Sequence, residues 1–349
     1  MRILHALRGL EATSGISSFV VEVCNAQVQA GHDVVFVYQR SLERTFDEKV
    51  IVLNEGDLNC LGFKPDVVHI HAIWTPFSVR IMRWCVRNNI PFIVSTHGCL
   101  MPRVLQNGRL KKWVFLNFLL RPLLAKARCI HCTSEDEKRA CEKVGLKNKF
   151  TVIPIGCDLP RLGGERKKEI LFLGRVAEEK GLDLFLSAWN SIDHNGWRFL
   201  IAGPDWLVYQ SKLEKQIKDE NIKDVEFLGL ADADKKDKLY RSASLFVLPS
   251  PNENFSIVVL DALAYGVPVI CTKGTPWGCI AEKECGWWVE PNSVTALKDA
   301  LSQALKGDFE ILATMGLRGR NLAETEYSWA KVNENLINVY MAIHKEERS

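Results

Sequence analysis

Several patterns that define common protein classes are missing from this chain of 349 residues. No run of eighteen or more apolar residues occurs, so we expect no membrane-spanning helix. No Gly-x-Gly-x-x-Gly follows an apolar run and no Gly-x-x-x-x-Gly-Lys-Ser/Thr occurs, which disfavours dinucleotide-dependent dehydrogenases and nucleoside triphosphatases. The 11 cysteines are dispersed, as is typical of core residues in a reducing compartment. Arg8 and Glu11 interrupt the apolar N-terminal stretch, which predicts a first strand rather than a signal peptide and therefore a cytoplasmic protein.

Acidic residues are missing from one long stretch. Residues 1–150 contain 21 Lys and Arg against 13 Asp and Glu, whereas the remainder contains 24 against 29. Between Val67 and Ser134 there is no acidic residue, and there are ten basic ones. A block of one sign favours an anionic partner surface, and the alternative is a solvated face of an ordinary fold.

Short apolar runs alternate with longer helical patterns along the chain. Val- and Ile-rich runs such as DVVHIHA and SLFVLPS are each followed by a helical stretch, which predicts parallel sheets covered on both faces. The pattern pauses in the Pro- and Gly-rich segment 153–166 and then restarts. We therefore predict an α/β fold of two Rossmann-like, doubly wound domains facing across a cleft that holds the ligand. The predicted domains are 1–160 and 161–330, and a C-terminal helix in 331–349 can cross back to the first.

Two stretches of the second half suit an anionic ligand. In FLGRVAEEKG, Gly174, Arg175 and Lys180 follow a predicted strand, and a guanidinium beside an ammonium suits a diphosphate. In SPNENFSIVVLDALAYG, Glu253 precedes a helix that starts near the cap residue Ser256, and Asp261 follows about two turns later. Amides of that first turn favour an anion or sugar oxygens. The alternatives are solvated helix-flanking cations and an acid favoured by the helix dipole.

This combination closely resembles the donor-binding signature of retaining glycosyltransferases of family 4, which have the two-domain GT-B fold. The family pattern is an acid, seven residues and a second acid, followed by Gly-x-Pro-Val, with a Gly-Arg…Lys-Gly loop upstream. The first half supplies DVVHIHA, STHG, a TSE segment and an IPxG linker in matching order. Departures from the family pattern are Asp261 for a usual Glu, Ser256 for a usual Gly, Ile155 for a frequent Asn, and Thr13-Ser14-Gly15 for a Gly pair.

The resemblance implies a role for each matching residue. Arg175 and Lys180 would hold the donor diphosphate. Glu253 would bind sugar hydroxyls and Asp261 the ribose, while His97 would contact the sugar near the reacting carbon. The other residues implied in donor binding are Gly15, Gly174, Asn254, Phe255 and Ser256.

The implied reaction is retaining transfer from a nucleotide-diphosphate sugar, with UDP favoured, to a saccharide or polyprenyl-diphosphate-linked acceptor in surface polysaccharide biosynthesis. The departing phosphate would take the acceptor's proton, so no protein base is assigned. Because Arg175 and Lys180 can stabilise that phosphate, we expect no cofactor and no required metal. Asp232 and Asp234 resemble a metal-binding Asp-x-Asp, but their position predicts a helix cap.

Two alternatives remain open. A sugar epimerase or phosphorylase could use the same two-domain fold, because fold does not determine function. A nucleic-acid-binding protein could use the basic half, although no recognised nucleic-acid motif occurs and we expect no nucleic-acid partner.

The first half holds the predicted acceptor side. Segment 107–129 mixes basic and aromatic residues, as an interfacial helix does, and Pro122 predicts a kink or break in it. We expect it to dock on an anionic membrane at the inner face, or to be a core helix with a wet basic side. His69 and His71 share one face of a strand, but no third metal ligand occurs at suitable spacing, so acceptor contact or core packing is favoured. The candidate acceptor or membrane residues are His71, Arg109, Lys111, Lys112 and Trp113.

Overall fold

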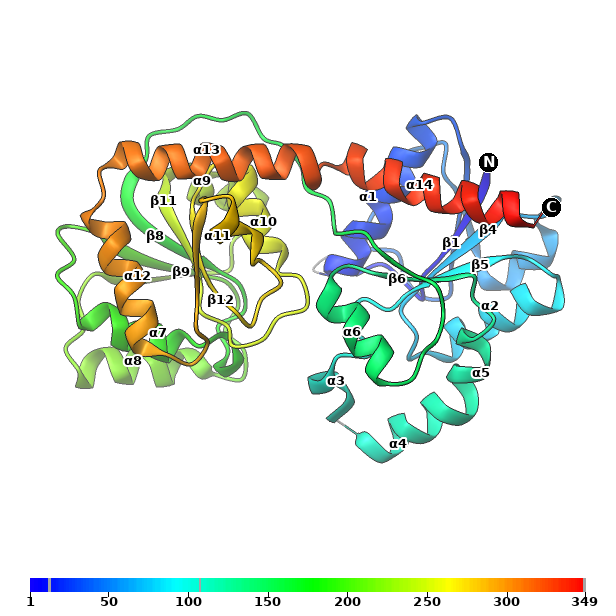
Figure 1. Cartoon of the computed structure of the whole chain (residues 1–349), viewed down its shortest axis with the longest axis horizontal. Coiled ribbons are helices and arrows are strands. Elements are labelled where there is room, and N and C mark those ends of the chain that lie inside the picture. Colours follow the sequence, from blue (N-terminus) through cyan, green and yellow to red (C-terminus); the bar gives the residue numbers. More distant parts are fainter. Residues whose placement is uncertain (12–13, 107, 348–349) are drawn as a thin grey trace. The chain divides into compact units, whose positions relative to one another are not determined.

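The computed structural model describes residues 1–11, 14–106 and 108–347, and it divides into two compact units (Figure 1). One unit consists of Met1–Gly156 together with Trp329–Ser349, and the other consists of Cys157–Ser328. The observed boundary therefore lies four residues before the predicted one, and the C-terminal helix belongs to the first unit. Within the described residues, no helix is long and apolar enough to cross a membrane.

The first unit is built on a parallel sheet of seven strands in the order β3-β2-β1-β4-β5-β6-β7. The strands are β1 (Arg2–Ala6), β2 (Asp33–Tyr38), β3 (Ile51–Asn54), β4 (Val67–His71), β5 (Phe92–Ser95), β6 (Cys129–Cys132) and β7 (Phe150–Val152). The strands β4, β5 and β6 are buried along their whole length, as expected for the middle of a sheet with helices on both faces. Sequence order reverses between β1 and β4, which is where ligands bind in doubly wound sheets.

Helices cover both faces of this sheet. They are α1 (Gly15–Gln29), η1 (Glu55–Cys60), α2 (Pro76–Arg87), α3 (Pro102–Gln106), α4 (Arg109–Val114), η2 (Phe115–Leu120), α5 (Arg121–Leu124), α6 (Glu135–Lys143) and α14 (Trp329–Glu346). The helices α1 and α14 pack side by side (Figure 1), and α14 also contacts β4. The end of the chain is thus part of the layer that covers β1 and β4.

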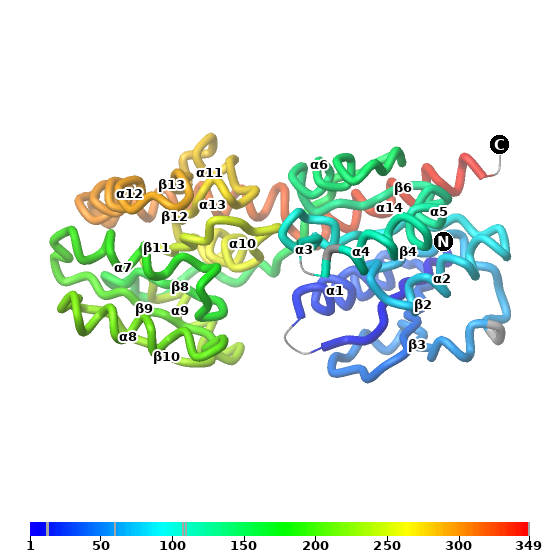
Figure 2. Tube along the Cα trace, turned by 90° about the horizontal axis from the view of Figure 1, so that it is seen from below, coloured from blue at the N-terminus to red at the C-terminus, as the bar shows by residue number. Residues whose placement is uncertain are grey.

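The second unit repeats the plan with six parallel strands in the order β10-β9-β8-β11-β12-β13, which Figure 2 shows from bottom to top. The strands are β8 (Lys167–Leu173), β9 (Arg198–Ala202), β10 (Val225–Gly229), β11 (Ala243–Leu248), β12 (Val269–Thr272) and β13 (Gly286–Val289). The helices are η3 (Glu178–Lys180), α7 (Leu182–Asn190), α8 (Tyr209–Asp219), α9 (Ala233–Ser242), α10 (Ile257–Ala264), α11 (Cys279–Glu282), α12 (Val294–Lys306) and α13 (Phe309–Glu326). The reversal lies here between β8 and β11.

Two neighbouring loops of this unit meet at the carboxyl ends of β8 and β9. Gly174 follows β8 and donates its N–H to Ala202 O over 2.9 Å. Gly203 follows β9 with φ +143°, and a Cβ there would lie 1.8 Å from Gly174 O. Only glycine allows this backbone approach, so Gly203 positions the loop that carries Arg175.

We predict that Gly203→Ala lowers the free energy of unfolding by more than about 2 kcal/mol, because the added methyl group would overlap a backbone oxygen at a positive φ. Gly229→Ala is the matched control, since Gly229 has φ +67° and nothing within 4 Å of a Cβ. It should cost about 1 kcal/mol of backbone strain alone. Urea unfolding measures both variants, and equal losses would contradict the steric argument.

Candidate active site

An ion pair joins the two predicted anion-binding stretches of the second unit. Lys180 ends η3 and Glu253 lies in the loop after β11, and Lys180 Nζ donates to Glu253 Oε1 over 2.5 Å. Their side chains are only 15% and 17% exposed. Gly181 has φ +68°, and a Cβ there would lie 2.6 Å from Pro249 O, so the η3 turn packs directly on the end of β11. This contact brings the ammonium to the carboxylate.

The loop that carries Glu253 is fixed by its backbone. Glu253 N donates to Gly274 O over 2.9 Å, and a Cβ at Gly274 would lie 1.9 Å from Pro251 O. The loops after β11 and β12 are therefore in backbone contact. Glu253 is thus presented from a rigid turn at the carboxyl end of the sheet.

Arg175 lies beside the same sheet edge in a more open setting. Its side chain is 46% exposed and pairs with Glu179 at 3.5 Å. Its guanidinium also lies 4.8 Å from the ring centre of Trp206. Both predicted diphosphate ligands therefore lie beside a carboxylate.

The start of α10 differs from the prediction in one respect. Ser256 is its cap residue by position, but it has φ +68° and its side chain makes no capping hydrogen bond. The left-handed conformation explains why the family pattern has Gly here. Ser256 Oγ is buried without a hydrogen-bond partner among the described residues. Phe255 is buried against Trp277 and Tyr327, and its carbonyl accepts from Trp277 Nε1 over 2.5 Å, which fixes the backbone around Asn254.

Asp261 lies within α10 itself, between Leu260 and Ala262. Burial raises the pKa of Asp261 to about 7, Lys236 lowers it and Asp158 raises it further. The carboxyl group therefore titrates near neutrality, where a small change in its surroundings decides its charge. By contrast, Asp232 caps α9 by accepting from Lys235 N over 2.8 Å, which confirms the predicted helix cap.

The remaining donor-side residues lie in the first unit. Gly15 begins α1, which Ser14 caps by accepting from Ser17 N, while Thr13 lies outside the described residues. His97 follows β5 with φ +47° and is half-buried. His71 ends β4, is 1% exposed, and shares a hydrogen bond of 3.1 Å between its Nδ1 and His97 Nε2. Because His71 is buried, direct contact between His71 and an acceptor is disfavoured. Any effect of His71 on a substrate would act through its hydrogen bond to His97.

Glu137 is a structural residue of this site that sequence reasoning missed. Its buried carboxylate accepts from Thr96 Oγ1 over 2.6 Å, from Gly98 N, and from Thr133 N over 2.7 Å. It thereby holds the STHG loop that carries His97. The signal was a Ser-x-x-Glu box from Ser134 to Glu137, whose serine caps α6 while the glutamate reaches across to another loop.

The fold corrects the expectation that His69 and His71 lack a third potential metal ligand. His5, on the adjacent strand β1, places a ring nitrogen within 4.8 Å of theirs. The spacing along the chain concealed this, because β1 and β4 pair across a long crossover. However, both ring nitrogens of His5, His69 and His71 already have protein hydrogen-bond partners, so the cluster is a hydrogen-bonded one.

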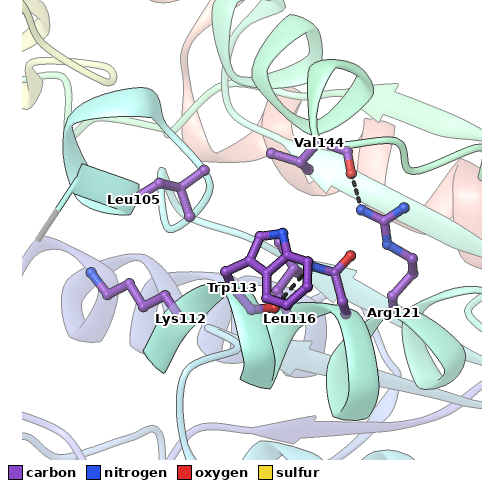
Figure 3. A pocket seen from close by; sticks show the side chains of 7 residues that line it. Leu105, Lys112, Trp113, Leu116, Arg121 and Val144 are labelled. Carbon is purple, nitrogen blue, oxygen red and sulfur yellow. Dashed lines mark hydrogen bonds between the residues drawn. The ribbon is translucent and has the colours of Figure 1, made fainter. Parts of the chain in front are cut away.

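The basic segment forms a helical path along the edge of the first unit. Pro122 does not break it: α4 continues as the π-helical turn η2 and then α5, with Pro122 in the first turn of α5. A cavity of about 270 Å³ lies beside this path and is lined by Leu105, Lys112, Trp113, Leu116, Asn117, Arg121 and Val144 (Figure 3). Lys112 donates to Val104 O and Arg121 to Val144 O, whereas Lys111 is exposed. Arg109 belongs to α4, and its side chain lies outside the described part.

Comparisons with known proteins agree with this geometry. Two family models match consecutive parts of the chain, Glycosyltransferase Family 4 over residues 13–161 and Glycosyl transferases group 1 over residues 161–322. A GDP-mannose:cellobiosyl-diphosphopolyprenol alpha-mannosyltransferase from Xanthomonas campestris is 27% identical, over 98% of this chain and 97% of its own. An uncharacterised glycosyltransferase from Methanocaldococcus jannaschii is 26% identical, over 79% of this chain and 75% of its own.

Solved structures share the architecture. Sucrose-phosphate synthase from Thermosynechococcus elongatus has a TM-score of 0.78 at 19% identity, with 99% of each chain covered. HepE from Anabaena in complex with UDP has a TM-score of 0.80 at 14% identity, with 98% of this chain and all of that chain covered. The chain has the GT-B fold and belongs to the group 1 glycosyltransferases, as the donor-site patterns predicted.

We predict that nucleotide affinity rises about tenfold between one pH unit below and one unit above the pKa of Asp261, which is about 7. If Asp261 binds the ribose, as the resemblance implies, only its ionised carboxylate can accept both hydroxyl protons, so the binding-competent fraction grows as pH rises through 7. Calorimetric titration with a nucleoside diphosphate measures this. Asp261→Asn is the control, since it leaves only the ionisation of the nucleotide itself. A variant with the full pH response would exclude Asp261 as the titrating group.

Proposed function

We propose that this protein is a retaining glycosyltransferase that moves a sugar from a nucleotide-diphosphate sugar to a lipid-linked saccharide. The observation that carries the proposal is the short Lys180–Glu253 contact at the carboxyl ends of β8 and β11. A sugar nucleotide has its diphosphate directly joined to a polyhydroxylated ring. A site that holds a cation and a carboxylate side by side offers one partner to each of these neighbouring groups.

The charge changes of the reaction match these residues. The bond between the anomeric carbon and the phosphate oxygen breaks, so negative charge grows on the diphosphate and positive charge on the sugar ring. Lys180, Arg175 and the first-turn amides of α10 stabilise the departing diphosphate where its charge develops. Glu253 accepts hydrogen bonds from sugar hydroxyls and holds the ring still. These side chains can perform this task without a metal ion.

The configuration at the anomeric carbon is retained if the acceptor approaches on the same face of the sugar from which the phosphate departs. The acceptor oxygen bonds to the anomeric carbon, and its proton passes to the departing phosphate oxygen. No protein base is needed for this step. By the resemblance to the family, His97 would contact the sugar near the reacting carbon.

The nucleotide base of the donor and the class of the acceptor are proposed from different observations. The resemblance to the family favours UDP, whereas the Xanthomonas relative is named for GDP-mannose. The same relative is named for a polyprenol-diphosphate acceptor, which supports a lipid-linked saccharide in polysaccharide biosynthesis. Thermal shifts with UDP-, GDP- and ADP-sugars separate the donors, because only a bound ligand raises the unfolding temperature.

We predict that Lys180→Ala and Glu253→Ala each lower kcat about 100-fold with the preferred sugar nucleotide, since each removes a charge aimed at the reacting groups. Turnover is measured by release of nucleoside diphosphate in the presence of lipid-linked acceptor. Lys212→Ala is the control, because Lys212 pairs with Glu178 on the exposed surface of the same unit. Wild-type rates in both site variants would contradict the assignment, and sugar-nucleotide turnover without acceptor would favour an epimerase.

An apolar patch supports docking of the first unit on a membrane. Leu110, Trp113 and Phe118 on α4 and η2 are 75%, 56% and 72% exposed, next to Lys111. With the exposed Lys111 beside them, these side chains offer aromatic anchors and a positive charge to an anionic headgroup layer. Such a surface would bring the enzyme to an acceptor that is embedded in the bilayer by its lipid.

We predict that the full chain sediments with equimolar phosphatidylglycerol–phosphatidylcholine vesicles at low salt and that Trp113→Ser with Phe118→Ser lowers the bound fraction at least fivefold. Leu230→Ser is the control, because Leu230 is 71% exposed on the second unit. High salt should release the wild-type protein, since headgroup attraction is screened. If the wild-type chain stays in the supernatant at low salt, the membrane proposal is wrong.

A further inference from the structure

Five of the eight histidines gather in the first unit, beneath the loop that carries His97. This histidine cluster consists of His5, His69, His71, His97 and His131. All but the half-buried His97 are at most 1% exposed. Their rings come from β1, β4, β6 and the turn after β5, and α1 and α14 lie beside one another over β1 and β4 (Figure 1).

These rings are neutral near pH 7. Burial lowers the pKa of His5 and His97 to about 4 and lowers the pKa of His69, His71 and His131 as well. Around His97, Glu137 on α6 raises its pKa and His131 on β6 lowers it. A neutral imidazole has one N–H donor and one bare acceptor nitrogen, so a hydrogen bond at one nitrogen fixes the role of the other.

One backbone carbonyl sets the direction of the first half of the network. Ile153 O can only accept, so His131 Nε2, at 2.8 Å, carries the proton and His131 Nδ1 is bare. That nitrogen accepts from Ser95 Oγ over 2.6 Å. Ser95 Oγ in turn accepts from His69 Nε2 over 2.6 Å. His69 Nδ1 is then bare and accepts from the Tyr340 hydroxyl over 2.5 Å.

The Gln27 amide begins the second half of the network. Its Nε2 is buried without a hydrogen-bond partner among the described residues, so no hydrogen bond joins Gln27 to Tyr340. Its Oε1 can only accept, so this oxygen sets the direction of the second half. Gln27 Oε1 then accepts from His5 Nε2 over 2.8 Å. His5 Nδ1 accepts from His71 Nε2 over 3.0 Å, and His71 Nδ1 accepts from His97 Nε2 over 3.1 Å.

We propose that the second half of this network, from Gln27 Oε1 to His97, holds His97 as the Nε2–H tautomer and presents its Nδ1 lone pair to a hydroxyl group of the substrate. His5, His71 and Gln27 are positioning residues for His97. Within the described residues, His97 Nδ1 has no hydrogen-bond partner of its own. The assignment of the tautomer stands on the hydrogen bonds alone, whereas the hydroxyl partner rests on the proposed transferase function.

The test is the tautomer of each ring in the full chain, measured by long-range ¹H–¹⁵N NMR with ¹⁵N-histidine near neutral pH. We expect a bare Nδ1 and a protonated Nε2 at His97, assigned from the resonances lost in His97→Gln. Gln27→Leu removes the acceptor of His5 Nε2, and we expect His97 to populate both tautomers. His5→Phe removes the acceptor of His71 Nε2 and should have the same effect.

Tyr240→Phe is the control, because Tyr240 is a buried polar side chain of the second unit and donates to Val258 O. It should leave every ring of the histidine cluster unchanged. If His97 carries its proton on Nδ1 in the wild-type protein, or keeps one tautomer in both Gln27→Leu and His5→Phe, the network does not set its state. If one variant fails to fold, the other decides.

Activity gives a separate readout. Equal population of two tautomers halves the competent fraction, so kcat should fall about twofold in Gln27→Leu while the Kd of the donor nucleotide is unchanged. If NMR shows the change of tautomer but kcat with a working donor is unchanged, the proposed contact between His97 and a substrate hydroxyl is wrong. If no donor supports transfer at all, the proposed function fails, and the NMR result still decides the network.

Discussion

The ion pair of Lys180 with Glu253 determines the geometry of the donor side, because it ties together two loops that lie 73 residues apart in the chain. These loops are neighbours only because β8 and β11 are adjacent at the reversal of the sheet. Close backbone contacts at Gly181 and Gly274 then leave no room for either loop to move away. A largely buried ion pair costs desolvation that apolar side chains would avoid, so its presence favours a functional explanation over a stabilising one.

The first unit differs in that polar histidine rings are buried below an edge of its sheet. Each ring of the histidine cluster loses hydration, and the loss is offset only if both nitrogens find partners. Strand pairing supplies them: β1 and β4 bring His5 beside His69 and His71, while α1 and α14 bring Gln27 and Tyr340. The C-terminal helix α14 is therefore held on the first unit by the hydrogen bond between Tyr340 and His69 as well as by its buried apolar side chains.

Local patterns predicted much of this molecule. The alternation of apolar runs predicted the doubly wound sheets, and the position of Asp232 predicted its cap. Pairings across long crossovers could not be predicted from spacing alone, which is why His5 was missed as a neighbour of His69. Ser256 shows a different limit: its residue type predicts a side-chain cap, but the backbone takes a left-handed turn and leaves Oγ unpaired. Glu137 was not singled out from the sequence, because its carboxylate accepts from Thr96 and Gly98, which are distant along the chain.

The two units respond to pH with opposite signs. The histidine cluster has pKa values below the unfolded 6.5, so its contribution to stability is complete above that pH and is lost as pH falls toward about 4. Asp261 has a pKa raised from 3.8 to about 7, so its contribution is present at low pH and is lost as pH rises through 7. Above pH 7 the second unit therefore holds an ionised carboxylate whose cost of burial Lys236 offsets only in part. If Asp261 binds the ribose, as the resemblance implies, the ribose hydroxyls would donate hydrogen bonds to this carboxylate and favour its ionised form.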